Sequence, residues 1–360
     1  MRIGFLGDGS LNHVRRWAGY FHDRGHEVLL ISFEDIGGCK FPARRIEKRL
    51  PTKILGYLSA LGSVQRVLDS FKPELVNALY VGGYGLIGAL GGFRPLVVSA
   101  LGSDLLVDYR SHLFHKIQIR HAIRRADLVT TDADNLSEIA ASIGAPPEKI
   151  LKIYFGIDED LFHPQTDRQT ISERKSGRFN IVSTRNLYPI YNIDLLIEAA
   201  PAVLDRIDAT FVICGAGPER KRLEAKASRL GVAERFVFKG KLEPADIADQ
   251  LRCAAVYLST SLSDSTSVSL LEAMACGAPP VVTDLPANRE WIENRVNGLL
   301  VPPGDPAALA GAVIEMAENT DLSRKAREKN LRIIKERGLW NLNMERLENA
   351  FLELAASRKK

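Results

Sequence analysis

The order of apolar segments along this 360-residue chain predicts an α/β protein with two parallel-sheet domains. Each half begins with a short apolar strand, at residues 2–6 and 179–183, and then alternates helices with further strands. Strands that alternate with helices form a parallel sheet with helices on both of its faces. The length also suits two domains of ordinary size. The polar segment 165–178 has no hydrophobic period, and we predict that it links the two domains.

The composition is that of a globular protein and disfavours several other classes. Hydrophobic residues make up 46% of the chain and charged residues 26%, as in ordinary soluble domains. A net charge of +4 is too small to indicate a nucleic-acid partner. The four cysteines show no metal-site spacing, which favours a reduced, cytoplasmic setting. The N-terminus lacks the apolar core of a signal peptide, and the apolar run 81–93 is too short to span a bilayer.

The first half contains six predicted strands. The loop at residues 7–12 follows the first strand and lacks the third glycine of the dinucleotide-binding fingerprint, which disfavours an oxidoreductase. A helix at 13–24 comes next. The later strands are expected at 27–31, 75–80, 96–100, 127–131 and 149–154, and the later helices at 54–71, 81–92, 115–125 and 136–143.

The second half repeats the alternation. Its strands are expected at 179–183, 209–214, 236–238, 254–258 and 281–283, and its helices at 193–204, from the turn after 217 to 230, and at 245–252 and 268–275. A final amphipathic helix is predicted at 340–355.

A basic segment spans residues 40–53. It contains one acid, Glu47, and six cations: Lys40, Arg44, Arg45, Lys48, Arg49 and Lys53. One interpretation is a solvated basic face. The other is a surface that binds an anionic acceptor or an anionic membrane leaflet.

The segment 254–283 reads as strand, polar loop, helix, tight turn and strand. Gly277 stands where a helix-ending glycine belongs, with prolines directly after it. The unit places a helix N-terminus at the carboxyl end of a parallel strand. Unpaired N–H groups and the positive end of the helix dipole suit a phosphate there, and Ser265, Thr266 and Ser267 add hydroxyl groups.

Glu272 stands out within the predicted helix. Helical spacing puts it near Val268, Leu271 and Ala275, on the apolar face. A buried carboxylate needs a partner. A vicinal diol such as a ribose would serve, and so would a local arginine or backbone N–H groups.

Residues 264–277 resemble the nucleotide-sugar site of family 4 of the retaining glycosyltransferases, the group 1 type with the GT-B fold. That family has two acids eight positions apart, here Asp264 and Glu272, and the second is followed by Ala-Met-Ala-x-Gly, here 273–277. The chain departs from the family in having Asp rather than Glu at 264. It also has Ser-Thr-Ser at 265–267 in place of glycine, an aromatic residue and glycine.

The resemblance extends to residues 155–164 and 297–305 and implies a GT-B architecture of two Rossmann-like α/β/α domains facing across a cleft. Residues 1–164 would form the acceptor-side domain and residues 179–337 the nucleotide-sugar domain. Residues 338–360 would form a helix that returns to the first domain.

The resemblance also implies roles for the second-domain residues. Glu272 would hold the ribose, and Asp264 would contact the donor sugar. Arg185 follows the first strand of this domain, where a guanidinium can clamp a pyrophosphate. Together with Ser265, Thr266 and Ser267 it would bind the diphosphate; the alternative for Arg185 is a surface salt bridge. The family's second cation is replaced by Tyr191, and the hydroxyl cluster or Lys241 would compensate.

In the first domain the resemblance points to two loops. Gly9 and His13 would lie near donor and acceptor, although His13 would equally suit a solvent-facing first helical turn. Residues 101–104 resemble a family loop, His-Gly-Ser-Asp, that reaches the donor sugar. Leu101 replaces the histidine. Asp104 is the remaining catalytic candidate, with helix N-capping as its alternative.

The implied function is that of a retaining hexosyltransferase. It would move a sugar from a UDP- or GDP-sugar to a glycan or lipid-linked hydroxyl acceptor, in the biosynthesis of cell-surface polysaccharide or glycolipid. It would act in the cytoplasm, and peripheral contact with the inner membrane face is left open. No cofactor is expected. No Asp-x-Asp sequence accompanies the site, so we also expect no metal, with fixed cations and dipoles in its place.

Two alternatives stay open. The departures at Leu101, Tyr191 and Asp264 favour a non-catalytic nucleotide-sugar-binding module or partner subunit. A GT-B epimerase would need histidines in its cleft, and residues 179–330 contain none.

Overall fold

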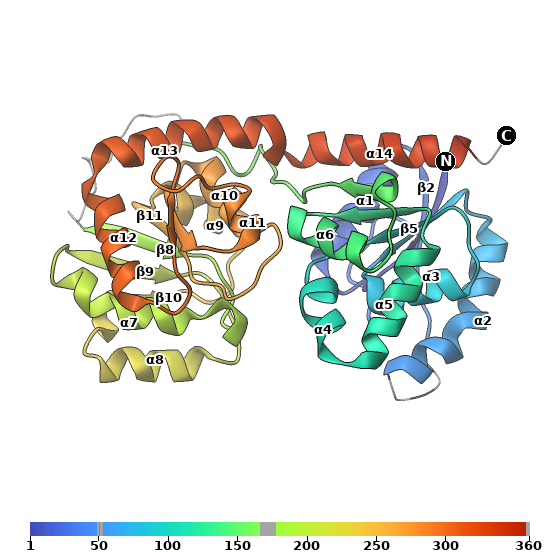
Figure 1. Cartoon of the computed structure of the whole chain (residues 1–360), viewed down its shortest axis with the longest axis horizontal. Helices are drawn as coiled ribbons and strands as arrows, with labels where there is room; N and C mark the ends of the chain where they lie inside the picture. The colour runs from blue at the N-terminus through green and yellow to red at the C-terminus, as the bar shows by residue number, and fades with distance from the viewer. Residues whose placement is uncertain (49, 51–52, 166–177, 358–360) are drawn as a thin grey trace. The chain divides into compact units, whose positions relative to one another are not determined.

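A computed structural model describes residues 1–48, 50, 53–165 and 178–357, which form two α/β units (Figure 1). Unit 1 consists of Met1–Tyr154 and Met344–Lys360, and unit 2 of Phe155–Asn343. The predicted linker 165–178 lies almost wholly outside the described residues. None of the described helices is both long and apolar enough to cross a membrane.

Unit 1 is built on a seven-stranded parallel sheet in the order β3-β2-β1-β4-β5-β6-β7. The chain runs first towards one edge, and then β4 pairs on the other side of β1, with Ile3 opposite both Val28 and Leu75. The strands are β1 (Arg2–Leu6), β2 (Glu27–Ser32), β3 (Ala43–Arg45), β4 (Leu75–Leu79), β5 (Leu96–Ser99), β6 (Leu128–Thr131) and β7 (Ile150–Lys152). The central strands are continuous apolar runs because helices cover both faces.

The helices of unit 1 are α1 (Asn12–Asp23), α2 (Lys53–Phe71), α3 (Leu86–Leu90), α4 (Tyr109–Ser111), α5 (Leu113–Arg125) and α6 (Asp134–Ser142). The single helix expected at 81–92 is instead a π-helical turn, η1 (Val81–Gly85), followed by α3. Tyr80, which precedes the turn, has a positive φ of 91°. A second π-helical turn, η2 (Asp104–Asp108), precedes α4, and a 3₁₀ turn, η3 (Pro147–Lys149), precedes β7.

Unit 2 contains a six-stranded parallel sheet in the order β10-β9-β8-β11-β12-β13. Its strands are β8 (Phe179–Ser183), β9 (Ala209–Ile213), β10 (Phe236–Phe238), β11 (Val256–Ser259), β12 (Pro280–Thr283) and β13 (Leu299–Val301). The sequence did not predict β13 or, in unit 1, β3. Both are edge strands of three residues, too short to show a period.

Helices cover both faces of the unit 2 sheet (Figure 1). They are α7 (Ile193–Leu204), α8 (Arg220–Arg229), α9 (Pro244–Arg252), α10 (Val268–Cys276), α11 (Pro286–Arg289), α12 (Pro306–Glu318) and α13 (Thr320–Ile333), with short turns η5 (Pro189–Tyr191), η6 (Ala233–Arg235) and η7 (Ile334–Gly338). α7 packs against α8 and α12, whereas α10 packs against α9 and α13. The two parallel-sheet units confirm the predicted fold class.

The last helix, α14 (Trp340–Ala356), starts in unit 2 and belongs to unit 1 from Met344 onward. This confirms the expected return of the C-terminal helix. Its apolar side is buried in unit 1, where Phe351 stacks on Phe21 with a centroid distance of 5.1 Å.

A buried carboxylate also bonds α14 to the rest of unit 1. Glu348 accepts hydrogen bonds from the Tyr20 hydroxyl (3.1 Å) and Arg24 Nε (3.2 Å), and His26 Nε2 lies 2.8 Å from its other oxygen. Burial alone would raise the pKa of Glu348. The hydrogen bonds from His26 and Tyr20 and the charge of Arg24 outweigh burial and hold it below its ordinary value.

We expect Glu348→Gln to lower the free energy of unfolding of unit 1 by about 1–3 kcal/mol at pH 7, because hydrogen bonds to a charged acceptor are weakened. The folded-state pKa is lowered, so this stabilisation is present at neutral pH and is lost as the pH falls below the ordinary value of 4.5. Denaturant unfolding of both proteins at neutral and acidic pH measures the difference.

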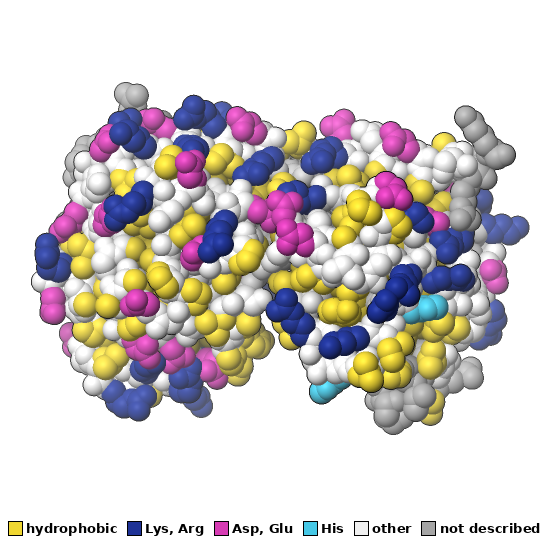
Figure 2. All heavy atoms as spheres, in the orientation of Figure 1, with side chains coloured by type: hydrophobic (Ala, Val, Ile, Leu, Met, Phe, Trp, Pro, Cys, Tyr) yellow, Lys and Arg dark blue, Asp and Glu magenta, His cyan; other side chains and the backbone are white. Residues whose placement is uncertain are grey.

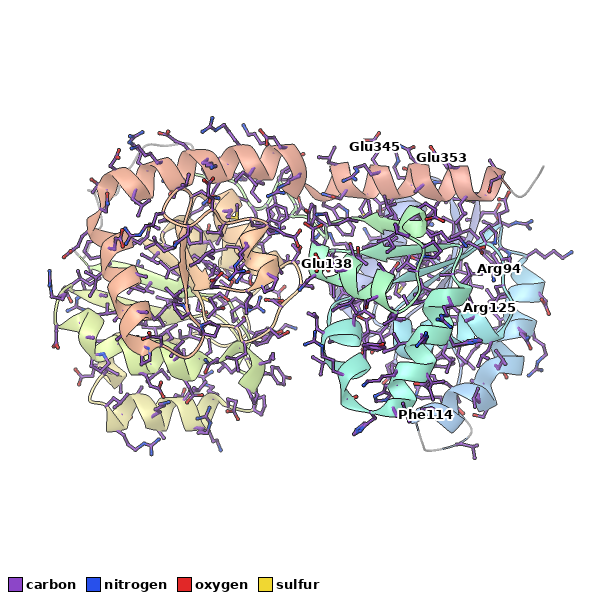
Figure 3. All side chains as sticks on the ribbon, viewed as in Figure 1. Arg94, Phe114, Arg125, Glu138, Glu345 and Glu353 are labelled. Atoms are coloured by element: carbon purple, nitrogen blue, oxygen red, sulfur yellow. The ribbon has the colours of Figure 1, made fainter. Side chains whose placement is uncertain are left out.

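Glu353, on the exposed side of the same helix, provides the control (Figure 3). Glu353→Gln should change stability by no more than about 0.5 kcal/mol. Equal stability of the wild type and the Glu348 variant at pH 7 would contradict a stabilising role for the Glu348 hydrogen bonds.

Candidate functional site

The candidate site of unit 2 lies where the strand order of its sheet reverses. β8 pairs with β9 on one side and with β11 on the other, so the connections that leave these two strands diverge. In open parallel sheets a crevice forms at this point, outside the carboxyl ends of the strands. The two loops that leave it are 184–192, after β8, and 260–267, after β11.

Hydrogen bonds join these two loops. The Thr260 hydroxyl lies 3.1 Å from the carbonyl oxygen of Tyr191 and 2.8 Å from that of Asn192, and it is buried. The Leu262 N–H donates to the Ile190 carbonyl at 2.9 Å. The loop after β8 is therefore held in register with the loop after β11.

Two glycines allow a third loop to approach. A Cβ on Gly215 would lie 2.3 Å from the carbonyl oxygen of Arg185, and one on Gly217 would lie 2.2 Å from that of Leu187. Both distances are to backbone atoms, which cannot rotate away. The Gly-x-Gly sequence after β9 therefore supports the backbone on which Arg185 stands.

Arg185 is the centre of the site. It is 8% exposed, and its guanidinium donates to the hydroxyls of Ser267 and Ser269, each at 2.8 Å, and to Asp264 Oδ2 at 2.6 Å. The ring of Tyr191 lies against it, 4.2 Å from centroid to guanidinium carbon. Four side chains from two loops and one helix thus fix this cation.

The environment keeps Arg185 charged. Burial disfavours the guanidinium charge, but Asp264, together with Tyr257 and Tyr191, offsets this, so the pKa of Arg185 lies above its ordinary value. Burial raises the pKa of Asp264, while Arg185 acts in the opposite direction. The result is a desolvated ion pair at the carboxyl edge of the sheet.

Several buried polar atoms beside this pair lack a partner within the part of the chain that the structure describes. They are Arg185 Nε, Ser183 Oγ and Thr184 Oγ1, all at the carboxyl end of β8. Buried polar groups are nearly always hydrogen-bonded in folded proteins. Adjacent unsatisfied donors next to a buried cation therefore suit an anionic ligand.

The first turn of α10 forms the other side of the site. Ser267 is the N-cap, and its hydroxyl accepts from the Leu270 N–H at 3.4 Å. Ser265 and Thr266 are buried beside it, whereas Val268 and Ser269 are half-buried. The structure confirms the helix, and Gly277 ends it with a φ of 79° as predicted.

The burial of Glu272 differs from the expectation. Apart from Glu272, Val268 and Ser269, every residue of α10 is buried, and these three are half-buried. The expectation that Glu272 lies on the apolar face is therefore wrong. α10 is covered nearly all round, and Glu272 is on the turn that follows the helix N-terminus, on the least covered side. A carboxylate there can meet a ligand without full desolvation.

Lys241 does not lie beside Arg185. It is exposed in the loop after β10, and β9 lies between β10 and β8. Two strand spacings separate the strands by about 10 Å. Lys241 shares the carboxyl edge with the site, but Tyr191, Ser267 and Ser269 surround the guanidinium instead.

Gly9 and His13 follow β1, at the corresponding point of unit 1, where the strand order reverses between β1 and β4. Gly9 is buried; its N–H donates to Ser32 Oγ at 2.9 Å and its carbonyl accepts from Arg15 at 2.7 Å. His13 is exposed in the first turn of α1. Of these two residues, His13 is the one with an exposed side chain.

Asp104 is fully buried, and its carboxylate accepts hydrogen bonds from three backbone N–H groups. These come from Val81 (3.0 Å), Leu101 (3.2 Å) and Leu105 (3.0 Å). Burial raises its pKa to about 6, against these hydrogen bonds. The geometry supports a structural role: the side chain accepts from the first residue of η1 and from Leu105 in its own turn, although Ser103, not Asp104, is the N-cap residue of that turn.

The sequence missed Ser269 and Tyr257. The Tyr257 hydroxyl donates to Ser269 Oγ at 3.0 Å, and Ser269 accepts from Arg185. Ser269 could have been found from the sequence, because it lies two residues after the N-cap serine, Ser267, in the first turn of the same helix. Within the described ranges, no three His, Cys, Asp or Glu side chains are grouped so that they could hold a metal ion.

Two family models match this chain. A model of group 1 glycosyl transferases matches residues 178–319, and a model of glycosyl transferase 4-like proteins matches residues 2–133. N-acetyl-alpha-D-glucosaminyl L-malate synthase of Bacillus anthracis is 26% identical over 66% of this chain and 62% of its own length. D-inositol 3-phosphate glycosyltransferase of Geodermatophilus obscurus is 32% identical over 52% of this chain and 44% of its own length. The chain spans about half the length of the curated relatives it matches.

A solved structure resembles the whole chain. HepE of Anabaena, in complex with UDP and glucose, superposes with a TM-score of 0.82 over 98% of this chain and 100% of its own, at 21% identity. At that identity the likeness shows a shared fold.

We expect Gly217→Ala to destabilise unit 2 by about 1–3 kcal/mol, because its Cβ would force the loop that carries Arg185 to move. Denaturant unfolding measures the change. Gly311→Ala is the control: Gly311 is exposed within α12, with nothing within 4 Å of its Cβ position. It should stabilise the unit by up to about 1 kcal/mol. A Gly217 variant as stable as the wild type would refute the close approach.

Proposed function

We propose that this chain, which belongs to the group 1 glycosyltransferases of family 4 and has the GT-B fold, transfers a sugar from a nucleoside-diphosphate sugar to an acceptor hydroxyl. One observation carries the donor site. Arg185, charged and buried, keeps an unpartnered Nε beside Ser183 and Thr184 and next to the first turn of α10, within the described residues.

The diphosphate would bind between the carboxyl end of β8 and the N-terminus of α10. Arg185 Nε, the free donors of the loop and the first-turn N–H groups would meet its oxygens. Each hydrogen bond to such a charged acceptor contributes about 1.5–3 kcal/mol. Tyr191 stands where the family has a second cation, and its contact with Arg185 would hold the remaining cation in place.

Glu272 would bind the ribose of the nucleotide. It lies one helical turn beyond the α10 N-terminus, on the half-buried side. A carboxylate accepts two hydroxyl donors at once, which suits a vicinal diol. Asp264 would contact the donor sugar with the exposed part of its side chain while it holds Arg185.

The proposed chemistry retains the anomeric configuration. The bond between the sugar anomeric carbon and the leaving phosphate oxygen breaks, and the acceptor oxygen bonds that carbon from the same face. The acceptor proton passes to the leaving phosphate oxygen. Arg185 and the α10 dipole stabilise the charge on the diphosphate, so no metal ion is required.

The donor we propose is a UDP-hexose, with a GDP-sugar as the second candidate. HepE, one of the structural neighbours, was solved with UDP and with UDP-glucose, which supports a uridine nucleotide. The acceptor would be a glycan or lipid-linked molecule in the synthesis of cell-surface polysaccharide or glycolipid, in the cytoplasm. Gly9 and His13 of unit 1 would lie on the acceptor side.

A second candidate is a nucleotide-sugar-binding module without catalysis. Two observations favour it. Arg185 is already in contact with Asp264 and Tyr191. Tyr191 also replaces the second cation of the family, so the site has one fixed cation in place of two. Both the transferase and the binding module would bind the nucleotide sugar, but only the transferase would turn it over.

We expect slow nucleotide release from one member of a panel of UDP-, GDP-, ADP- and TDP-sugars. Glu272→Ala should abolish it because the ribose contact is lost, and EDTA should leave the wild-type rate unchanged because no metal is involved. Released nucleotide is the readout, and nucleotide-dependent thermal stabilisation is measured in parallel.

Glu318→Ala is the matched control, since Glu318 is exposed at the end of α12. No release and no stabilisation by any nucleotide would refute the donor site. Stabilisation without release, persisting when candidate acceptors are added, would favour the binding module.

We expect Arg185→Lys to lower the release rate about a hundred-fold while the protein stays folded. An ammonium group cannot reproduce the planar fork that reaches Ser267, Asp264 and the ligand together. Steady-state rates measure the loss, and Arg229→Lys, at the exposed end of α8, should be neutral. Wild-type rates in the Arg185 variant would contradict the proposed role of its guanidinium.

A further inference from the structure

The hydroxyl of Ser269 lies at the centre of the hydrogen-bond network around Arg185. Ser269 is the second residue of α10 and is half-buried. Its Oγ accepts hydrogen bonds from Arg185 Nη1 at 2.8 Å and from the Tyr257 hydroxyl at 3.0 Å. A serine hydroxyl has one proton to donate and two lone pairs with which to accept. Arg185 and Tyr257 therefore fill its acceptor capacity, and its own proton must be donated elsewhere.

The direction of the Tyr257 hydrogen bond follows from burial. Tyr257 is fully buried, and within the described residues the one hydrogen-bond partner of its hydroxyl is Ser269 Oγ. If Ser269 donated to Tyr257, the phenol proton would be left without an acceptor inside the protein, which is costly. Burial also raises the pKa of Tyr257, so the phenol stays protonated. Tyr257 is thus the donor, and Ser269 is the acceptor.

The neighbouring Ser267 cannot accept the Ser269 proton, although the two Oγ atoms are 3.1 Å apart. Ser267 Oγ already accepts from Arg185 Nη1 at 2.8 Å and from the Leu270 N–H at 3.4 Å, so both of its lone pairs are occupied. Its proton goes to Asp264: burial raises the pKa of that carboxyl, and Arg185 and a hydrogen bond from Ser267 act against burial. Among the residues that the structure describes, no acceptor remains for the Ser269 proton.

This proton lies where the diphosphate is proposed to bind. Ser269 is in the first turn of α10, whose N–H groups and dipole attract an anion. Arg185, which is 8% exposed, has a buried Nε without a partner, as have Ser183 Oγ and Thr184 Oγ1 beside it in the described part of the chain. A phosphate oxygen can accept from hydroxyl and guanidinium donors together.

The site offers no second cation for this purpose. Within the described ranges, Arg185 is the one lysine or arginine that hydrogen-bonds to Asp264, Ser267 or Ser269. Tyr191 stands in place of the family's second cation and stacks on the guanidinium. Figure 2 shows the lysine and arginine side chains on the outer surface of unit 2, interspersed with acidic ones. A neutral hydroxyl is therefore the donor available to supplement Arg185.

We propose that Ser269 donates its proton to an oxygen of the diphosphate of the nucleotide sugar, and that Tyr257 holds the hydroxyl in this orientation. The inference rests on the donor site proposed above and adds to it one ligand and one positioning residue. Arg185 and Tyr257 hold the Ser269 oxygen by its two lone pairs, so its O–H bond points away from both of them. Little reorganisation is then needed when the phosphate arrives.

Calorimetric titration of the full chain with UDP and with GDP, each compared with its nucleoside, tests the proposal. Ser269→Ala should weaken binding of the diphosphate about ten-fold or more, because a hydrogen bond to a charged acceptor is lost. Binding of the nucleoside should not change. Ser269→Thr should restore the affinity to within about two-fold of the wild type, since threonine keeps the hydroxyl.

Tyr257→Phe tests the positioning role. The Ser269 proton is still present in this variant but is no longer oriented, so binding of the diphosphate should weaken by about two- to five-fold, less than in Ser269→Ala. An affinity equal to that of the wild type would overturn the role of Tyr257.

A double variant separates the ligand role of Ser269 from a structural one. Ser269→Ala leaves the buried Tyr257 hydroxyl without an acceptor and should lower the midpoint of thermal unfolding. The double variant Ser269→Ala/Tyr257→Phe removes both partners and should recover most of that stability, because no buried polar group is left unsatisfied. Its affinity for the diphosphate should stay as low as that of Ser269→Ala. Recovery of affinity together with stability would overturn the proposal.

Ser228→Ala is the matched control. Ser228 is exposed on α8, and its hydroxyl donates to the Glu224 carbonyl oxygen of the same helix at 3.1 Å. The substitution should change neither nucleotide affinity nor the midpoint of unfolding.

The role of Ser269 and the donor site fail separately. If the wild type binds neither UDP nor GDP, the donor site fails and the role of Ser269 fails with it. If the wild type binds one of them and Ser269→Ala binds it equally well, or loses affinity for the nucleoside to the same extent, the role of Ser269 alone is overturned.

Discussion

Parallel strands impose one constraint on both units, and the location of each candidate site follows from it. Every strand must be followed by a crossover to the same end of the sheet, so all carboxyl ends gather along one edge. The strand order reverses once in each sheet, between β1 and β4 and between β8 and β11. The loops at those reversals are left uncovered by helices, which is why functional side chains can collect there.

In unit 2 that opening is organised around a desolvated cation. The guanidinium of Arg185 would be costly to bury alone, and the surrounding residues compensate it by an ion pair, two hydroxyls and an aromatic face. Its support is also steric, since Gly215 and Gly217 let the neighbouring loop pack against the backbone of residues 185–187. Such a fixed charge needs little reorganisation when an anion arrives.

Local signals made much of this fold predictable. The α10 boundaries follow from the N-cap serine and from Gly277, and the strand–helix alternation gives the parallel sheets. Side-chain partners were not predictable, because they come from distant positions: Asp264 meets Arg185 across 79 residues, and Asp104 meets Val81 across 23. Periodicity also cannot tell which side of a short helix stays open, and for that reason the burial of Glu272 was overestimated.

The path of α14 has a consequence for how the protein is made. Unit 1 is discontinuous in sequence, because Met344 onward completes a domain that began at the first residue. A ribosome therefore finishes all of unit 2 before it supplies the helix that covers Phe21 and His26. Until then the first unit carries an exposed apolar seam and cannot reach its final stability. Its maturation is thereby tied to complete translation of the chain through α14.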